Sequence, residues 1–203
     1  KEGVFEIENQ IKKHEETNKT NWHTSKDTIF RIKAVIPNFD LDPASDEEAN
    51  ENIGAFEIYE KEGLKYTWSG NVFCCPPTTG KKTGKWVRRM LQSYKAKQTK
   101  AGVCVVECAP WEVWFIEATF HASCAFLRSV AWTGPGAKHG PKNACVLYFG
   151  DNHRGFAQSF QGFAVFPPRG AKHDNFPYSV EQVDVEELED GPVEPIEALK
   201  PLF

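Results

Sequence analysis

Apolar and polar residues follow two different patterns along this chain, helical spacing and short continuous apolar runs. In segments 25–36 and 84–97, apolar side chains recur every three or four residues, which predicts amphipathic helices. Segment 111–120 is a third, more apolar helix candidate, while the weaker patterns of 1–20 and 47–62 indicate peripheral helices. Short apolar runs between these segments predict buried strands. The runs are 39–42, 71–75, 101–110, 123–134 and 144–150.

The order of these elements predicts the fold class. Strands that alternate with helices favour an α/β fold, with a mostly parallel sheet covered by helices on both faces. We expect one such domain at 22–166, between a polar N-terminal extension (1–21) and a C-terminal extension with an acidic tail (167–203). After Arg154 the periodic patterns weaken, and no further strand or helix is predicted there.

The composition argues against several classes of protein. No apolar stretch approaches the roughly 20 residues that cross a bilayer, and the first residues, KEGVFEIENQ, lack the apolar core of a secretion signal. The six cysteines form no C-x-x-C pair, and no histidine lies at zinc-finger spacing from a cysteine pair. We therefore expect an intracellular protein, in cytoplasm or nucleus, with reduced thiols, no metal site and no membrane contact.

Charge is distributed unevenly, although the net charge is only −4. Acidic residues gather at 40–62 and 181–194, whereas 81–100 holds eight Lys or Arg and no Asp or Glu. A local basic face of this kind can attract phosphates. It can equally be a solvated helix face, and the charge pattern by itself leaves both interpretations open.

Two of the predicted strands end in turns with polar chemistry, FDLDPAS and VFCCPPTT. In parallel sheets, ligands bind beyond the carboxyl ends of the strands. Asp42 in the first turn can accept hydrogen bonds from a ribose hydroxyl or an amino group, or it can act only as a helix cap. In the second turn, Pro76 and Pro77 fix the backbone. Their carbonyls are either rigid acceptors for a ligand or part of a stiff strand exit.

The two turns occur in this order about 30 residues apart, and together they resemble the phage-type DNA adenine-N6 methyltransferase family. Members of that family carry a Thr-Pro helix start, a strand that ends in Asp-Pro-x-Ala/Ser, and an Asn/Asp-Pro-Pro-Tyr tetrapeptide. The matching segments here are NWHTSKDTIF, FDLDPASDEEANEN and WSGNVFCCPPTTGKKTGKWVRRM. The likeness continues through VCVVECAPWEVWF and, more loosely, to Phe149.

The resemblance implies a Rossmann-like, class I methyltransferase-like fold that binds S-adenosylmethionine. Its partner would be double-stranded DNA with the target base flipped out of the helix, and the chain could also serve as a subunit beside a protein partner. By this likeness, the cofactor site would be lined by Thr24, Ser25, Asp40, Asp42, Pro43 and Ala44. The target base would be held by Cys75, Pro76, Pro77 and Thr78. The DNA backbone would pass Lys81, Lys82, Lys85, Arg88 and Arg89, with a second rim at Lys138, His139 and Lys142.

The family tetrapeptide has a chemical purpose. The exocyclic amine of a base is a poor nucleophile because its lone pair is delocalised into the ring. A polar side chain and a backbone carbonyl that accept hydrogen bonds from its two N–H groups free that lone pair. Alignment of the amine with the methyl group then supplies most of the rate enhancement, and no strong base is needed. Here Cys75 stands where the family has Asn or Asp, and Thr78 stands where it has an aromatic residue. A thiol is a weak acceptor, and Thr78 has no face on which a base can stack.

Three interpretations therefore stay open: an active enzyme with relocated roles, an inactive DNA-binding or partner subunit, and a site for a different ligand. We favour an active methyltransferase with adenine N6 as its target, because the cofactor half of the pattern is intact. Cytosine N4 is the alternative target, since related enzymes use Ser-Pro-Pro-Tyr and Cys is close to Ser in shape. In an active enzyme, the aromatic ring that stacks on the target base would come from Trp68, Phe73, Trp111 or Trp114. Thr78 or Thr79 would supply a hydrogen bond.

A nucleophilic role for Cys75, as in carbon-5 cytosine methylation, is disfavoured. That chemistry uses a Pro-Cys thiolate, whereas the order here is Cys-Pro and no partner base is evident in the sequence. A buried thiol beside Cys74 is the favoured interpretation.

Overall fold

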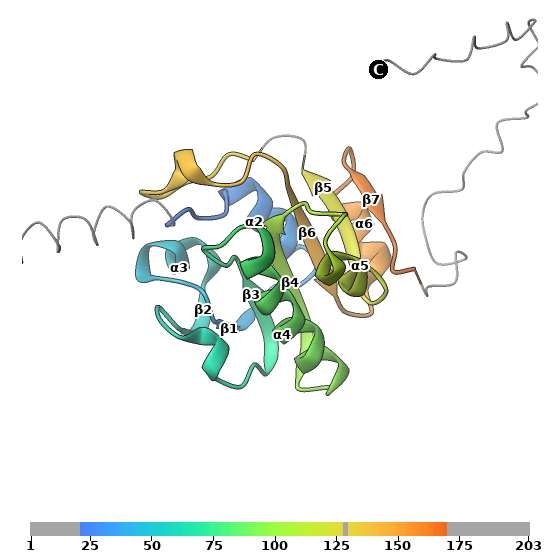
Figure 1. Ribbon diagram of the computed structural model, residues 1–203, viewed down its shortest axis with the longest axis horizontal. Helices are drawn as coiled ribbons and strands as arrows, with labels where there is room; N and C mark the ends of the chain where they lie inside the picture. The colour runs from blue at the N-terminus through green and yellow to red at the C-terminus, as the bar shows by residue number, and fades with distance from the viewer. Residues whose placement is uncertain (1–20, 128–129, 170–203) are drawn as a thin grey trace, which may run out of the picture.

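A seven-stranded sheet lies at the centre of the computed structural model, which describes residues 21–127 and 130–169 (Figure 1). Its strands lie in the order β2-β1-β3-β4-β6-β5-β7. Their bounds are β1 Phe39–Asp42, β2 Ala55–Ile58, β3 Gly70–Cys74, β4 Thr99–Glu107, β5 Ser123–Leu127, β6 Ala144–Phe149 and β7 Ala164–Phe166. The helices are α2 Lys26–Lys33, α3 Glu47–Ile53, α4 Thr83–Lys95, α5 Val113–Thr119 and α6 His153–Ser159, with short 3-10 helices η1 Gly63–Lys65, η2 Gly80–Lys82 and η3 Ala137–His139.

The strands β1 to β5 run in one direction, and β6 and β7 run against it. The predicted α/β fold class is thus confirmed, with a sheet that is parallel from β2 to β4 and mixed beyond. Strand β6 pairs antiparallel with both β4 and β5. Because an antiparallel neighbour needs no crossover helix, β5 leads into β6 through the loop that contains residues 130–143 without an intervening α-helix.

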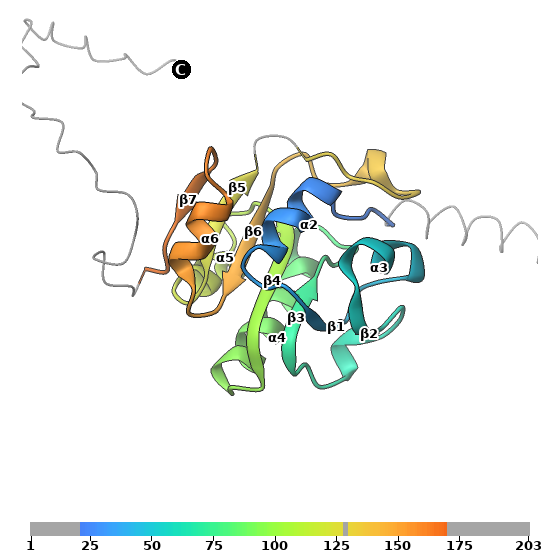
Figure 2. The same cartoon turned by 180° about the vertical axis from the view of Figure 1, so that it is seen from behind.

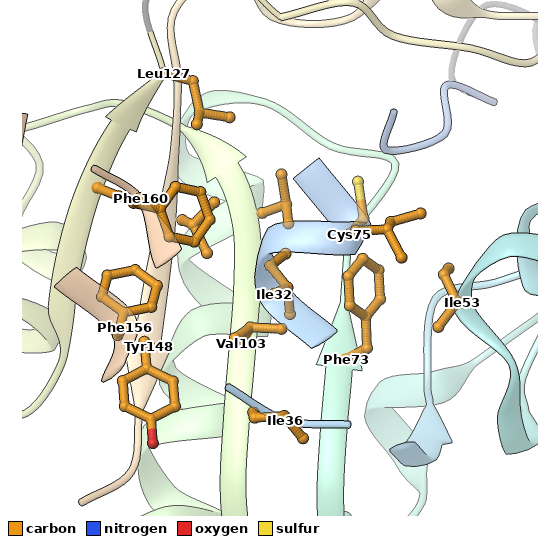
Figure 3. Close-up of a cluster of buried hydrophobic side chains, with 14 of the residues drawn as sticks. Ile32, Ile36, Ile53, Phe73, Cys75, Val103, Leu127, Tyr148, Phe156 and Phe160 are labelled. Carbon is orange, nitrogen blue, oxygen red and sulfur yellow. The ribbon is translucent and has the colours of Figure 1, made fainter. Parts of the chain in front are cut away.

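The helices cover both faces of the sheet, and each face has its own apolar core. Helices α2, α3 and α6 pack on one face, and α4 and α5 pack on the other (Figures 1 and 2). On the first face, Ile32 of α2, Phe156 of α6 and Phe73 of β3 belong to one continuous core (Figure 3). Successive strand residues point to opposite faces. Cys75 therefore belongs to this core, while Cys74 belongs to the core under α4.

Two helices start at capping side chains, Ser25 as predicted and Asp46, which was not predicted. Ser25 precedes α2, and its hydroxyl accepts a hydrogen bond from Thr28 N at 3.4 Å. Asp46 precedes α3, and its Oδ1 accepts from Ala49 N at 2.7 Å. Gly54 ends α3 in the left-handed conformation at φ 65°, which a glycine adopts without steric cost. This tight stop is what allows β2 to start only one residue later.

Three of the element predictions are corrected. The helix expected at 47–62 is only α3, and it is followed by strand β2. The chain beyond Arg154 is not without regular structure, because it continues as α6 and β7. Both are short and are held by distant partners: Phe156 and Phe160 of this region are fully buried, and among the described strands β7 pairs with β5 alone. The strand expected at 123–134 ends at Leu127.

The expected extensions fall mainly outside the described residues. The peripheral helix at 1–20 and the acidic tail beyond Arg169 lie outside them, and the domain boundaries at 22 and 166 stay a prediction. Within the described part of the chain, no helix is long and apolar enough to cross a membrane. Residues 21–127 and 130–169 contain no cluster of three or more His, Cys, Asp or Glu side chains arranged to hold a metal ion.

Candidate active site

A cavity of about 380 Å³ opens at the carboxyl edge of the sheet, where β1 and β3 end. These two strands are parallel neighbours, with Leu41 opposite Val72, so the turns that follow them emerge side by side. The two polar turns predicted from the sequence therefore share one cavity. Its walls come from four parts of the chain: Asn21–Thr24, Asp42–Asp46 with Ala49 and Ile53, Tyr59–Gly63, and Cys75, Pro77 and Trp86.

Asp42 is the most unusual polar group in this cavity. Its side chain is 1% exposed, and its Oδ1 accepts a hydrogen bond from Ala44 N at 3.0 Å. Its Oδ2 is buried with no hydrogen-bond partner among the described residues. Burial raises the pKa of Asp42 to about 7, although the Ala44 N–H and the nearby Ser45 hydroxyl act in the opposite direction. A buried acceptor left unpaired is costly, so a donor placed in the cavity would be bound favourably here.

Thr24 and Cys75 form the second polar contact of the cavity. Thr24 is 3% exposed, and its hydroxyl makes no hydrogen bond within the described part of the chain, although it lies beside the Cys75 thiol. Burial raises the pKa of Cys75 to about 12, and the Thr24 hydroxyl offsets this only in part. The thiol therefore stays protonated near neutral pH. A protonated buried thiol is not a nucleophile, which agrees with the favoured interpretation from the sequence.

The turn that carries the tetrapeptide is anchored on both sides. Thr78 N donates to the Pro76 carbonyl at 2.7 Å, and the buried Thr83 hydroxyl donates to the Thr78 carbonyl at 2.9 Å. Gly80 N donates to Oε2 of Glu107, at the end of β4, at 2.7 Å. The Pro76 carbonyl keeps a second lone pair, and Pro77 is exposed and lines the cavity. Of the four residues expected to hold the base, Cys75 and Pro77 thus line the cavity, whereas Pro76 and Thr78 are not among its lining residues.

The six residues expected at the cofactor site divide into two groups. Thr24, Asp42, Pro43 and Ala44 line the cavity. Ser25 and Asp40 do not: Ser25 caps α2, and Asp40 is exposed and accepts a hydrogen bond from Asn71 N at 2.7 Å. The physical reason for Asp40 is its position along the strand. Residues 40 and 42 share one face of β1, but only Asp42 lies at the end where the cavity opens.

The aromatic residues expected to stack on a base are mostly core residues. Trp68 and Phe73 are 0% exposed and Trp114 is 2% exposed, so none of the three has a free face. Trp111 is 72% exposed on the loop after β4. Trp86 of α4 lies in the segment predicted as an amphipathic helix, and it is half-buried and lines the cavity. Its spacing in the helix carried no signal of this second role.

Several lining residues were missed because no local motif marks them. His23 Nε2 lies 3.0 Å from Asp46 Oδ2. Burial raises the pKa of Asp46, but its hydrogen bonds with Ala49 N, Asn21 and His23 outweigh burial and lower it overall. The loop Tyr59–Gly63 closes another wall. Gly63 allows this, since a Cβ there would lie 1.7 Å from the Pro43 carbonyl oxygen.

The basic residues expected to contact DNA differ in whether their charged groups already bind other residues of the protein. Lys81, Lys82 and Lys85 are exposed, and none of them forms an ion pair with another described residue. Arg88 instead pairs with Glu117 at 2.7 Å, and Arg89 donates to the Tyr66 carbonyl at 2.6 Å. Both arginines thus fasten α4 to neighbouring segments. The second expected rim, Lys138, His139 and Lys142, is exposed.

The fold and the cavity define a class of protein: an α/β protein with a cavity of about 380 Å³ that is lined in part by buried polar residues, beyond the carboxyl ends of two parallel strands. The family model for DNA N-6-adenine-methyltransferase (Dam) matches residues 11–128, more than half of the chain, and the chain belongs to this family. No curated protein and no solved structure matched the chain in the corresponding comparisons.

Enzymes of this family generally use S-adenosylmethionine, and the cavity fits that group. Its volume lies within the roughly 300–1,000 Å³ of small-molecule sites. The cofactor carries ribose hydroxyls and amino groups, which are donors. The unpaired Asp42 Oδ2 and the Thr24 hydroxyl are acceptors at the wall. The donor and acceptor sets therefore complement one another.

Proposed function

We propose that this protein is an S-adenosylmethionine-dependent methyltransferase that acts on the exocyclic amino group of a DNA base, with adenine N6 as its preferred target. The observation that carries the proposal is the shared cavity. Asp42 and Thr24 line the same cavity as Cys75 and Pro77, and each carries a buried polar atom, Oδ2 and Oγ1, that has no hydrogen-bond partner among the described residues. The family match supports the reaction class and the base.

Each part of the site has a role in this proposal. Thr24, Asp42, Pro43 and Ala44 hold the cofactor, which supplies an electrophilic methyl group when bound. The free lone pair of the Pro76 carbonyl, or the Pro77 carbonyl, accepts a hydrogen bond from the target amine. Because the turn is anchored by Thr83 and Glu107, these acceptors need no rearrangement during the reaction, and alignment supplies most of the rate.

A second candidate function is a catalytically inactive DNA-binding subunit. Cys75 favours it, because a buried, protonated thiol is a poor substitute for the carboxamide or carboxylate of the family tetrapeptide. Cytosine N4 is a further target to be considered, since Cys75 replaces Asn or Asp by a residue close to Ser in shape.

Mass spectrometry of nucleosides separates these functions. The full chain is incubated with unmethylated duplex DNA and S-adenosylmethionine that carries an isotopically labelled methyl group, and the DNA is then digested. We expect labelled N6-methyladenine. Labelled N4-methylcytosine would identify the other target. Absence of both products from folded protein that binds DNA would overturn the enzymatic proposal in favour of the subunit.

Replacing Lys81, Lys82 and Lys85 together by glutamine is expected to weaken DNA binding and to reduce its dependence on salt. Each neutralised phosphate contributes about 0.9 to the slope of log K against log salt concentration. The slope should therefore fall in magnitude by about 2 to 3 in the triple variant. Fluorescence anisotropy of labelled duplex DNA over a salt series measures this.

The chain offers a matched control for the lysine variant. Lys95, Lys97 and Lys100 are equally exposed but lie toward the opposite edge of the sheet, where α4 ends and β4 begins. Their replacement by glutamine removes the same charge and should leave the salt slope nearly unchanged. Equal salt slopes for the two triple variants would mean that these lysines affect DNA binding only through the net charge of the protein, and not through contacts of Lys81, Lys82 and Lys85 with phosphates.

A further inference from the structure

The loop of residues 130–143 crosses the carboxyl edge of the sheet and reaches the wall of the cavity. It joins β5 to β6 at the edge where the cavity opens, and it lies beside the segment that leads into α2 (Figures 1 and 2). Three backbone hydrogen bonds hold the two segments together: His23 N to Thr133 O at 2.8 Å, Thr133 N to His23 O at 3.0 Å, and Gly136 N to Asn21 O at 2.7 Å. Asn21 and His23 both line the cavity.

Side chains tighten the same junction. The His23 ring packs directly against the backbone of Gly134, where a Cβ would lie 2.7 Å from His23 Nδ1. The other ring nitrogen of His23 contacts Asp46 Oδ2 at 3.0 Å, at the start of α3. The rings of Trp22 and Trp132 are 6.4 Å apart. His23 is 7% exposed, so it joins the loop, the cavity wall and α3 in one packed unit.

The loop also presents positive charge outward. Lys138 and Lys142 are exposed, and His139 beside them is exposed as well. The loop follows β5, whose carboxyl end meets the same edge as the turn that precedes Lys81 and Lys82. A duplex that approached the cavity from this edge would therefore meet both basic groups.

We propose that His23 is a positioning residue that couples the cofactor cavity to this loop, so that binding of cofactor and binding of DNA strengthen one another. The proposal rests on the proposed function. A cofactor that contacts the wall at residues 21–24 restricts the segment that holds Thr133 and Gly136. The loop then has fewer conformations available when its lysines meet phosphates, and the entropic cost of restricting it falls on only one of the two binding events. Thermodynamic linkage makes the effect reciprocal.

The coupling is measured on the full chain with two ligands. Fluorescence anisotropy of labelled duplex DNA is recorded without and with saturating S-adenosylhomocysteine, which binds without turnover. We expect the adenosyl compound to tighten DNA binding by at least about 5-fold, the lower end of typical coupling between sites. Hydrogen exchange should show increased protection of the Thr133 and Gly136 amides when the compound is bound.

Two glycine variants test whether His23 carries the coupling. Gly134→Ala places a methyl group against the His23 ring, at a residue with φ 81°. Gly162→Ala imposes a similar backbone strain at φ 92°, but a Cβ there meets nothing within 4 Å. The ratio of DNA affinities with and without the compound should fall close to 1 in Gly134→Ala and stay at the wild-type value in Gly162→Ala. His23→Gln should behave like Gly134→Ala.

The outcomes separate this inference from the proposed function. If both ligands bind the wild-type protein but the affinity ratio is 1, the coupling is wrong and the methyltransferase proposal stands. A ratio that survives in Gly134→Ala and His23→Gln assigns the coupling to other residues and overturns the role of His23. If folded protein binds neither the adenosyl compound nor DNA, both proposals fail.

Discussion

Replacing Asp42 by asparagine is expected to weaken the binding of S-adenosylmethionine by about 10- to 100-fold, the range of one hydrogen bond to a charged group. The substitution keeps the acceptor for Ala44 N and nearly the same shape, but it removes the negative charge from a buried carboxylate whose residue lines the cavity. Isothermal titration calorimetry with the purified chain measures the dissociation constant.

Asp40→Asn is the matched control, because it makes the same chemical change two residues earlier in the same strand. Asp40 is exposed and bonded to Asn71 N, away from the cavity, so its variant should bind the cofactor as tightly as the wild type. Equal losses in both variants would contradict the assignment of the cavity as the cofactor site. Tight binding by Asp42→Asn would show that the carboxylate has no role in it.

The raised pKa of Asp42 makes the same interaction dependent on pH. The pKa is about 7 in the absence of ligand because burial disfavours the charged form. If the cofactor binds only the ionised carboxylate, affinity increases as pH rises through 7 and levels off near pH 8. At pH 6 it should be about tenfold weaker than on that plateau, since only the ionised fraction is competent. Asp42→Asn should lack this dependence.

The free energy of unfolding should fall as pH rises, whereas the affinity for the cofactor should increase. Because the folded pKa of Asp42 lies above the value of 3.8 expected in the unfolded chain, the folded state binds more protons between pH 4 and 7. The free energy of unfolding contributed by this group therefore falls as pH rises across that window, by on the order of 4 kcal/mol. Urea unfolding at pH 5 and pH 8 should show a loss of about 3 kcal/mol in the wild type, because about two pH units of the interval lie above pH 5. Asp42→Asn should not show this loss.

Restoring the family tetrapeptide is expected to raise methylation of adenine strongly. In the double variant Cys75→Asn with Thr78→Tyr, the carboxamide provides a strong acceptor for the target amine, and the ring provides a face for the flipped base. One hydrogen bond and one stacking contact together correspond to an increase on the order of 100-fold in kcat/KM. Transfer of labelled methyl groups to duplex DNA measures it.

Nearby positions supply the controls for this variant. Thr79→Tyr adds the same ring one residue later, at an exposed position, and Cys108→Asn makes the same change at a half-buried thiol outside the cavity. Neither should raise the rate. A rise from no detectable activity would identify the natural chain as a degenerate member of the family. A loss of activity in the double variant would show that Cys75 and Thr78 carry roles of their own.

Much of the local architecture could be predicted because its causes are local. Helix α2 follows from the Ser25 cap and the spacing of Ile29, Ile32 and Ile36, and β4 follows from a continuous β-branched run. Helix α6 and strand β7 could not be predicted in the same way. Their few apolar residues are buried by α2 and β5, which are remote in sequence, and the sequence pattern contains no trace of such partners.

The amino-acid sequence by itself determined the α/β class, the starts of the main helices and the two polar turns at Asp42 and Cys75, because propensity, capping and periodicity act over a few residues. Only the tertiary structure decided that Asp42 and not Asp40 faces the cavity, that Trp68 and Phe73 are core while Trp86 is at the wall, and that His23 meets Asp46. Those outcomes depend on strand neighbours and on packing between distant segments, which no local pattern of residues encodes.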